Sequence, residues 1–188
     1  MLRHRGLCFL EDTKMAKNEN LHKAKDAKND EFYTRIEDVA EELRHYKKHF
    51  EGKVVFCNCD DPTWSAFWRY FHLNFAELGL KKLISTHYDR TEPTYKMEYK
   101  GGDDNNVEVG VKTPLEGNGD FRNAECIKLL DECDIVVTNP PWSMFREYVS
   151  LLVEHKKQFV IIGNKNSIIV ISITLTTVGG LFRFCRKE

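Results

Sequence analysis

The residues best suited to chemistry form one short segment, Asn139-Pro140-Pro141-Trp142, which follows an apolar run at residues 135–137. The apolar run predicts a strand buried on both faces of a sheet. The prolines end that strand, because proline cannot donate a ladder hydrogen bond and restricts the residue before it to extended backbone. Open α/β sheets bind their ligands at the carboxyl ends of such strands. A stiff loop with an amide, backbone carbonyls and an indole is suited to holding a planar amine.

The exocyclic amine of adenine shows what this loop would accomplish. That amine is a weak nucleophile because its lone pair is conjugated into the ring. If the side-chain oxygen of Asn139 and the carbonyl of Pro140 each accept one N–H, the nitrogen becomes more tetrahedral and its lone pair becomes available. Trp142 would stack on the base, which has to leave its duplex to reach the loop. The simpler alternative is a strand end stopped by prolines, with Trp142 filling the core.

The elements that must position this loop alternate between strand and helix. Strands are predicted at residues 53–59, 80–88, 135–137 and 158–162, the last two of them buried, and helices at residues 34–50, 62–78, 123–132 and after residue 143. An edge hairpin is predicted from strands at residues 95–100 and 107–111. This alternation predicts an α/β fold with a doubly wound, mostly parallel sheet.

Local signals set the expected helix boundaries. Thr34 and Glu37 have the spacing of a capping box, and Ser143 is expected to cap the helix after the loop. Pro62 is expected in the first turn of an aromatic helix, behind the acidic pair Asp60-Asp61. Six aromatic and aliphatic residues are expected to pack that helix against the sheet: Trp64, Phe67, Trp68, Phe71, Phe75 and Leu78.

Composition limits the class of protein. The chain has 188 residues, 41% hydrophobic and 30% charged, which is typical of one globular α/β domain. The net charge of −1 does not favour a protein that coats nucleic acid, so DNA would have to be bound by a local patch. Six irregularly spaced cysteines indicate reduced thiols in the cytoplasm, without a metal site. No run has the length of a membrane span.

Three regions are expected along the chain. Residues 1–28 are lysine-rich and predict a flexible leader, and residues 29–167 carry the strand–helix alternation. Residues 168–188 are β-branched, then basic, and either form a last strand pair or depart from the preceding pattern; we favour a truncated or altered C-terminus. The predicted sheet is then incomplete, with exposed apolar edges.

Several segments together resemble the EcoRI-type adenine-specific DNA methyltransferases. The resemblance covers about residues 28–167 and is carried by the segments at 28–34, 55–62, 79–84, 139–148 and 161–166. The Asn-Pro-Pro-aromatic loop alone also occurs in N4-cytosine and N5-glutamine methyltransferases, so these remain alternatives. The combination of segments is more specific. The resemblance implies a Rossmann-like fold, S-adenosyl-L-methionine as methyl donor, and an adenine N6 in double-stranded DNA as acceptor.

The resemblance also implies roles for individual residues. Asn139, Pro140, Pro141 and Trp142 match the catalytic loop. The segment Phe32-Tyr33-Thr34 resembles one that lines the donor pocket, where aromatic faces suit a sulfonium cation. Asp120 resembles the acid that accepts from the donor's adenine amine, and Asp89 stands where an acid would hold ribose hydroxyls. The alternative for each acid is a turn or cap residue, and the ligand role is less well supported for Asp89 than for Asp120.

Two departures from the family pattern affect these expectations. The usual glycine-rich turn after the first strand is replaced by Asn58-Cys59-Asp60-Asp61-Pro62, so Asp60 or Asp61 is expected to hold the methionine end of the donor. Related enzymes also continue into a part that recognises the DNA site. An inactive remnant that keeps the fold, and with it donor binding, is therefore the second hypothesis.

Overall fold

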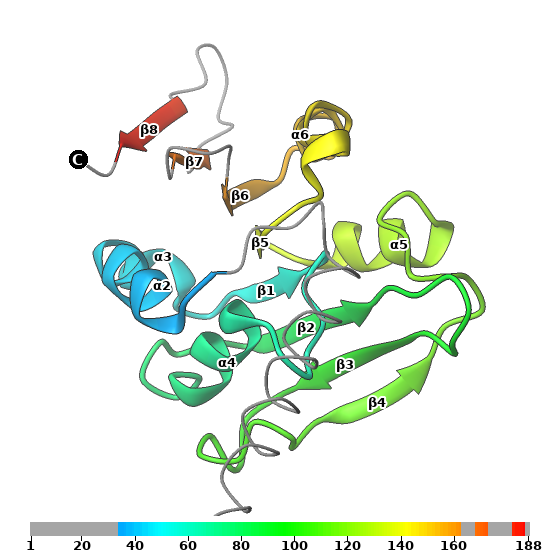
Figure 1. Cartoon of the computed structure of the whole chain (residues 1–188). Coiled ribbons are helices and arrows are strands. Elements are labelled where there is room, and N and C mark those ends of the chain that lie inside the picture. Colours follow the sequence, from blue (N-terminus) through cyan, green and yellow to red (C-terminus); the bar gives the residue numbers. More distant parts are fainter. Residues whose placement is uncertain (1–33, 163–167, 173–181, 187–188) are drawn as a thin grey trace, which may run out of the picture. The chain divides into compact units, whose positions relative to one another are not determined.

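A single mixed β-sheet forms the centre of the structure, a computed structural model that describes residues 34–162, 168–172 and 182–186. Its strand order is β4-β3-β2-β1-β5-β6-β7-β8 (Figure 1). The strands are β1 (Val54–Cys57), β2 (Lys82–His87), β3 (Tyr95–Tyr99), β4 (Val111–Pro114), β5 (Ile135–Thr138), β6 (Gln158–Ile162), β7 (Ile168–Ser172) and β8 (Phe182–Arg186). The strands predicted at residues 53–59, 80–88, 135–137 and 158–162 are confirmed as β1, β2, β5 and β6, with ends that differ by up to two residues.

The four central strands, β2, β1, β5 and β6, are parallel, so their carboxyl ends meet at one edge of the sheet. Strand β1 pairs with β2 on one side and with β5 on the other. The strands β3 and β4 continue the sheet beyond β2 as antiparallel neighbours. The fold is therefore mixed α/β, with a parallel centre extended by antiparallel strands.

Helices cover both faces of the central strands, because alternate residues of each strand point to opposite faces. Val55 and Cys57 belong to a core cluster shared with α2 (Ile36–Leu43), α3 (Lys47–Phe50) and α4 (Ala66–Leu73). Val54 and Phe56 belong to a second cluster shared with α5 (Ala124–Glu132) and α6 (Phe145–Glu154). Figure 1 shows the two groups of helices on opposite sides of the sheet.

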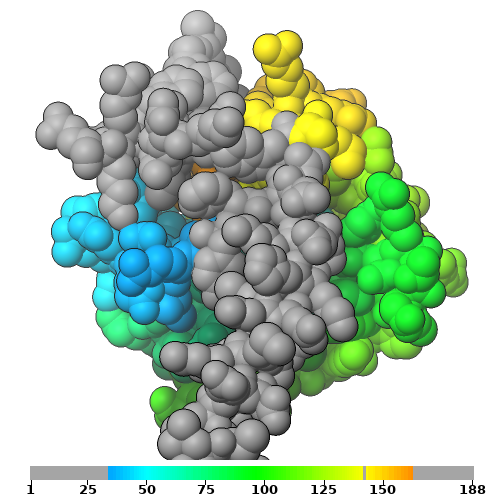
Figure 2. All heavy atoms as spheres, viewed as in Figure 1, coloured from blue at the N-terminus to red at the C-terminus, as the bar shows by residue number. Residues whose placement is uncertain are grey.

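Helix α6 follows the Asn-Pro-Pro-Trp segment and anchors it to the second core cluster. Tyr148 and Leu152 are buried on its inner side, whereas Arg146, Ser150 and Val153 lie on its exposed side. In Figure 2 this helix, coloured yellow, lies at the surface of the molecule. The helical spacing predicted after residue 143 is therefore confirmed.

Two of the expected helix starts are wrong. Helix α2 begins at Ile36, and its N-cap is Arg35, which has extended backbone and makes no side-chain capping bond, so Thr34 does not form the predicted capping box. Helix α4 begins at Ala66 rather than near Pro62. The Asp61 side chain accepts from the N–H of Thr63 at 2.8 Å, forming a turn that competes with helix.

The second strand of the edge hairpin and the cap of α6 also differ from expectation. Residues 107–110 do not pair in the sheet. The carbonyl of Val107 instead accepts from Trp68 Nε1 at 3.1 Å, and the carbonyl of Val109 lies 2.9 Å from His72 Nε2. Strand β4 therefore starts at Val111. A short 3-10 turn, η2 (Trp142–Met144), precedes α6, so Met144 and not Ser143 is the N-cap.

Residues 168–172 and 182–186, within the region expected to be atypical, form the strand pair β7 and β8. Strand β7 pairs antiparallel with β6, and β8 pairs antiparallel with β7. Of the two interpretations of this region, a final strand pair is the one that the structure describes. The domain boundary at residue 167 stays a prediction, as does the leader at residues 1–28, which lies outside the described residues.

Candidate active site

Asn139 lies at the carboxyl end of β5, where this strand adjoins β1. The residue is 6% exposed, and its backbone N–H donates to the Asp60 side chain, with 3.0 Å between the nitrogen and Oδ2. Pro140 is buried and Pro141 is half-buried. β1 lies between its successor β2 and the later strand β5, which is the position where open α/β sheets form ligand sites. The loop predicted at a strand end is therefore placed at the expected edge.

The Asp60 carboxylate is enclosed at the end of β1, with the residue only 4% exposed. Oδ1 accepts from the Ser65 hydroxyl at 2.8 Å, and Oδ2 accepts from the Thr138 hydroxyl and from the Asn139 N–H. Both oxygens are thus used by protein groups. The predicted contact between Asp60 and the methionine end of a donor would have to compete with these bonds.

The Asp61 carboxylate is half-enclosed and paired with a histidine. Its Oδ1 accepts from the N–H and the hydroxyl of Thr63, and its Oδ2 lies 2.6 Å from His87 Nδ1 at the end of β2. Burial alone would raise the pKa of Asp61, but the bonds from Thr63 and His87 together hold that pKa below its ordinary value. Asp61 is therefore a carboxylate fixed between the ends of β1 and β2.

Asp89 closes a turn just beyond β2. Its Oδ1 accepts from the N–H of Thr91 at 2.7 Å and the N–H of Glu92 at 2.9 Å, and these bonds lower its pKa to about 2. Asp89 is therefore a turn residue, as one of its two interpretations predicted. Within the described part of the chain, the hydrogen bonds from Thr91 and Glu92 all fall on Oδ1, which leaves Oδ2 for a ligand hydroxyl.

Asp120 forms a bidentate ion pair with Arg122. Its Oδ1 accepts from Arg122 Nε at 2.8 Å and its Oδ2 from Arg122 Nη2 at 2.7 Å. These bonds from Arg122 hold the pKa of Asp120 below its ordinary value, against burial, which raises it. Each carboxylate oxygen can accept more than one hydrogen bond, so Oδ2 keeps capacity for a further donor.

Gly119 brings the Asp120 loop against the end of β2. The Asp89 N–H donates to the carbonyl of Asn118 at 3.2 Å, and Gly119 has a φ of +75°. A Cβ at this glycine would lie 2.5 Å from the carbonyl oxygen of His87 and 3.1 Å from the Cα of Tyr88. The close approach of the loop before Asp120 to the end of β2 therefore requires glycine.

We expect Gly119→Ala to destabilise the fold by about 2 kcal/mol or more, because it adds a backbone clash to a positive φ. Gly102→Ala is the matched control: Gly102 has a φ of +131°, but a Cβ there would meet nothing within 4 Å. Urea unfolding of both variants separates the clash from the strain of positive φ. Equal losses in the two variants would show that the approach to His87 is unimportant.

The structure describes the aromatic residues predicted at the site only in part. Phe32 and Tyr33 lie outside the described residues, and for Trp142 only the backbone, in η2, is described. Thr34 is half-buried just before α2. The predictions for Phe32, Tyr33 and the Trp142 side chain therefore stay predictions.

Four polar residues that hold the candidate site were not predicted from the sequence. They are Ser65, His87, Arg122 and Thr138. Ser65 carries a usable signal, because a serine directly before an aromatic helical run is a preferred N-cap, and its Oγ accepts from the N–H groups of Phe67 and Trp68. The other three lack such a signal, because their partners are set by the packing of strands and loops.

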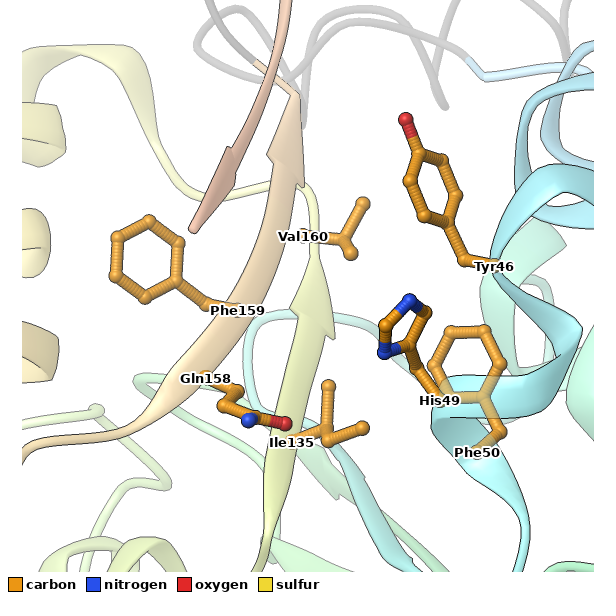
Figure 3. A pocket seen from close by; sticks show the side chains of 7 residues that line it. All are labelled: Tyr46, His49, Phe50, Ile135, Gln158, Phe159 and Val160. Carbon is orange, nitrogen blue, oxygen red and sulfur yellow. The ribbon is translucent and has the colours of Figure 1, made fainter. Parts of the chain in front are cut away.

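A shallow pocket lies at the opposite ends of the parallel strands, remote from the Asn139 loop. It is lined by Tyr46, His49, Phe50, Ile135, Gln158, Phe159 and Val160. Figure 3 shows Tyr46, His49 and Phe50 on the helical side, with Ile135 and Gln158 at the starts of β5 and β6 and the Phe159 ring turned away. No carboxylate is among its lining residues, and it lies away from the strand ends that carry Asp60, Asp61 and Asn139, so we do not assign it to the active site.

Two properties of the described residues bear on partners. None of the helices described is long and apolar enough to cross a membrane. Over the same part of the chain, no group of three or more His, Cys, Asp or Glu side chains is arranged to hold a metal ion.

Comparison with known proteins gives one consistent answer. Residues 20–175 match the family model described as "Adenine-specific methyltransferase EcoRI". The chain is 46% identical over 165 residues to "Type II methyltransferase M.EcoRI" of Escherichia coli, covering 81% of this chain and 51% of that protein. It is 45% identical over 147 residues to "Type II methyltransferase M.MpnI" of Mycoplasma pneumoniae, covering 78% of this chain and 44% of the relative.

A third relative is "Type II methyltransferase M.MgeORF184P" of Mycoplasma genitalium, at 43% identity over 144 residues, or 77% of this chain and 44% of that protein. No solved structure matches the chain. The chain spans about half the length of the curated relatives it matches. The family match confirms the resemblance drawn from the sequence segments: the chain belongs to the EcoRI family of adenine-specific methyltransferases.

Proposed function

We propose that this chain transfers a methyl group from S-adenosyl-L-methionine to the N6 amine of an adenine turned out of double-stranded DNA. The observation that carries the proposal is the placement of Asn139 and Pro140. They lie at the carboxyl end of β5 beside the end of β1, and the Asn139 backbone is bonded to a buried carboxylate. Adenine specificity rests on the family to which the chain belongs.

The loop contributes by holding the acceptor amine. The Asn139 side-chain oxygen and the Pro140 carbonyl each accept one amine N–H, which directs the nitrogen lone pair toward the methyl group. Because β5 is buried and the following residues are prolines, these acceptors are fixed before the base arrives. Trp142 supplies an aromatic surface on which the turned-out base stacks.

The donor is held at the neighbouring strand ends and loops. S-adenosyl-L-methionine supplies an electrophilic methyl group on a sulfonium, which the aromatic faces of Phe32 and Tyr33 beside Thr34 favour. Asp89 accepts from ribose hydroxyls through Oδ2, and Asp120 accepts from the adenine amine. Asp61 holds the ammonium of the methionine end. The fixed, ionised state of these three acids supports this set, because their pKa values are all lowered.

The arrangement of strands and helices supports the finer description of the fold. Four central parallel strands with helices on both faces favour a doubly wound, Rossmann-like methyltransferase domain. The three relatives are named type II methyltransferases, which supports a role in restriction and modification, with duplex DNA as the partner.

Calorimetric titration with S-adenosyl-L-methionine, beside a tritium-transfer assay on unmethylated duplex DNA, tests the proposal. We expect saturable donor binding, transfer of label to DNA, and recovery of the label in N6-methyladenine after digestion. Label in N4-methylcytosine, or in protein glutamine, would redirect the assignment to the corresponding alternative. Donor binding without transfer to either acceptor would contradict the proposal and support the inactive remnant.

A further inference from the structure

The Asp60 carboxylate connects three parts of the chain that meet at the candidate site. It follows β1, its Oδ1 accepts from Ser65 at the start of α4, and its Oδ2 accepts from Thr138 and Asn139 at the end of β5. We call Cys59, Asp60, Ser65, Thr138 and Asn139 the Asp60 network. The network is therefore a direct polar link between β1 and the loop that carries the acceptor groups.

The network also orients the groups that bond to the carboxylate. The Thr138 hydroxyl accepts from the Cys59 N–H at 2.9 Å, so its proton is directed toward Asp60. The Ser65 hydroxyl accepts from the N–H groups of Phe67 and Trp68 and likewise directs its proton to the carboxylate. Each donor thus has one geometry, and a carboxylate is the group that accepts from all of them at once.

Burial makes the loss of these hydrogen bonds energetically costly. Ser65 and Thr138 are fully buried, Asp60 is 4% exposed and Asn139 is 6% exposed, so water does not replace a missing acceptor readily. Bonds to a charged carboxylate are about twice as strong as neutral ones, and the penalty for leaving a buried donor unpaired is added to their loss.

We infer that Asp60 is a positioning residue, which fixes the Asn139 backbone for methyl transfer and does not hold the donor. This inference rests on the proposed function and changes the role expected for Asp60 from the sequence. The half-exposed neighbour Asp61 keeps the donor-facing role. The two adjacent acids differ in what they contact: Asp60 bonds to Asn139 after β5, and Asp61 pairs with His87 at the end of β2.

Asp60→Asn tests the inference, because the amide keeps the size of the side chain and loses one acceptor and the charge. We expect the single-turnover transfer rate at saturating donor and DNA to fall on the order of 100-fold, the effect of a small misplacement of a reacting group. The donor dissociation constant should stay within about twofold. The exposed acid Asp131 is the matched control, and Asp131→Asn should change neither quantity.

A second pair of variants covers the case in which Asp60→Asn does not fold. Thr138→Val removes the hydroxyl and should lower the transfer rate on the order of tenfold, whereas Thr138→Ser keeps the hydroxyl and should retain the rate. If Thr138 had only a general structural role, the two substitutions would lower the transfer rate by the same factor. If Thr138→Val and Thr138→Ser behave the same, or if Asp60→Asn weakens donor binding as much as it slows transfer, the inference is wrong.

Hydrogen exchange at the Asn139 amide gives a readout that does not depend on activity. In Asp60→Asn this amide should exchange at least about tenfold faster, while core amides such as those of Val55 and Leu83 keep their protection. Unchanged exchange at Asn139 would overturn the inference. If the unmodified chain transfers no methyl group, the proposed function fails, but this exchange measurement still decides the role of Asp60.

Discussion

Asn139→Ala is expected to lower the rate of methyl transfer by at least about 100-fold, the usual cost of removing one preorganised polar group from a reacting centre. The donor dissociation constant should change by less than about threefold, because the proposed donor contacts come from other segments. The Asn139 backbone bond to Asp60 is kept in alanine, so the loop should stay in place. Single-turnover tritium transfer and donor calorimetry measure the two quantities.

Asn105→Ala is the matched control for this change. Asn105 is an exposed amide in the turn between β3 and β4, so its removal is the same chemical deletion away from the site. The control should transfer methyl groups at the rate of the unmodified chain. Substantial transfer by Asn139→Ala would remove the basis for assigning the amide as an acceptor of the adenine N–H.

Trp68→Ala is expected to give the largest loss of stability, about 3–5 kcal/mol in the free energy of unfolding. Trp68 is fully buried between α4 and the sheet, and its indole N–H donates to the carbonyl of Val107. Alanine would leave both a large cavity and an unpaired carbonyl. Urea unfolding followed by circular dichroism measures the change.

Trp64→Ala provides the comparison within the same segment. Trp64 was expected to pack with Trp68, but it is 40% exposed, because the turn at Asp61 places it before the first residue of α4. Its removal should cost about 1 kcal/mol or less. A loss at Trp64 equal to that at Trp68 would mean that the aromatic stripe is continuous, as the sequence spacing alone predicted.

The parts of the fold that follow from sequence are those set by periodicity along one segment. The strand at residues 158–162 and the helix ending at Glu132 agree with prediction, because an apolar run or a helical spacing is a local property. The starts of α4 and β4 were missed for one shared reason. Side chains compete for backbone groups that a propensity rule assigns to helix or strand: Asp61, two residues away, does so before α4, and Trp68 and His72, from another element, do so before β4.

The residues of the candidate site likewise include some that local sequence predicts and some that it does not. Asn139 and its prolines were found because their composition interrupts a buried strand, which is visible in the sequence. The enclosure of Asp60 was not visible, because Ser65 and Thr138 approach it from different elements. Likewise, nothing in the spacing of Asp61 and His87 predicts that they pair across two strand ends.

The sequence separation within the Asp60 network has a consequence for the order of folding. Asp60 bonds to residues 78 and 79 positions later, and the Val54 N–H, at the other end of β1, bonds to Asp134 across 80 positions. Closing so long a loop costs more chain entropy than forming the hairpin of β3 and β4. The acceptor loop should therefore acquire its geometry late, after β1 and β5 have docked, and lose it whenever β5 detaches.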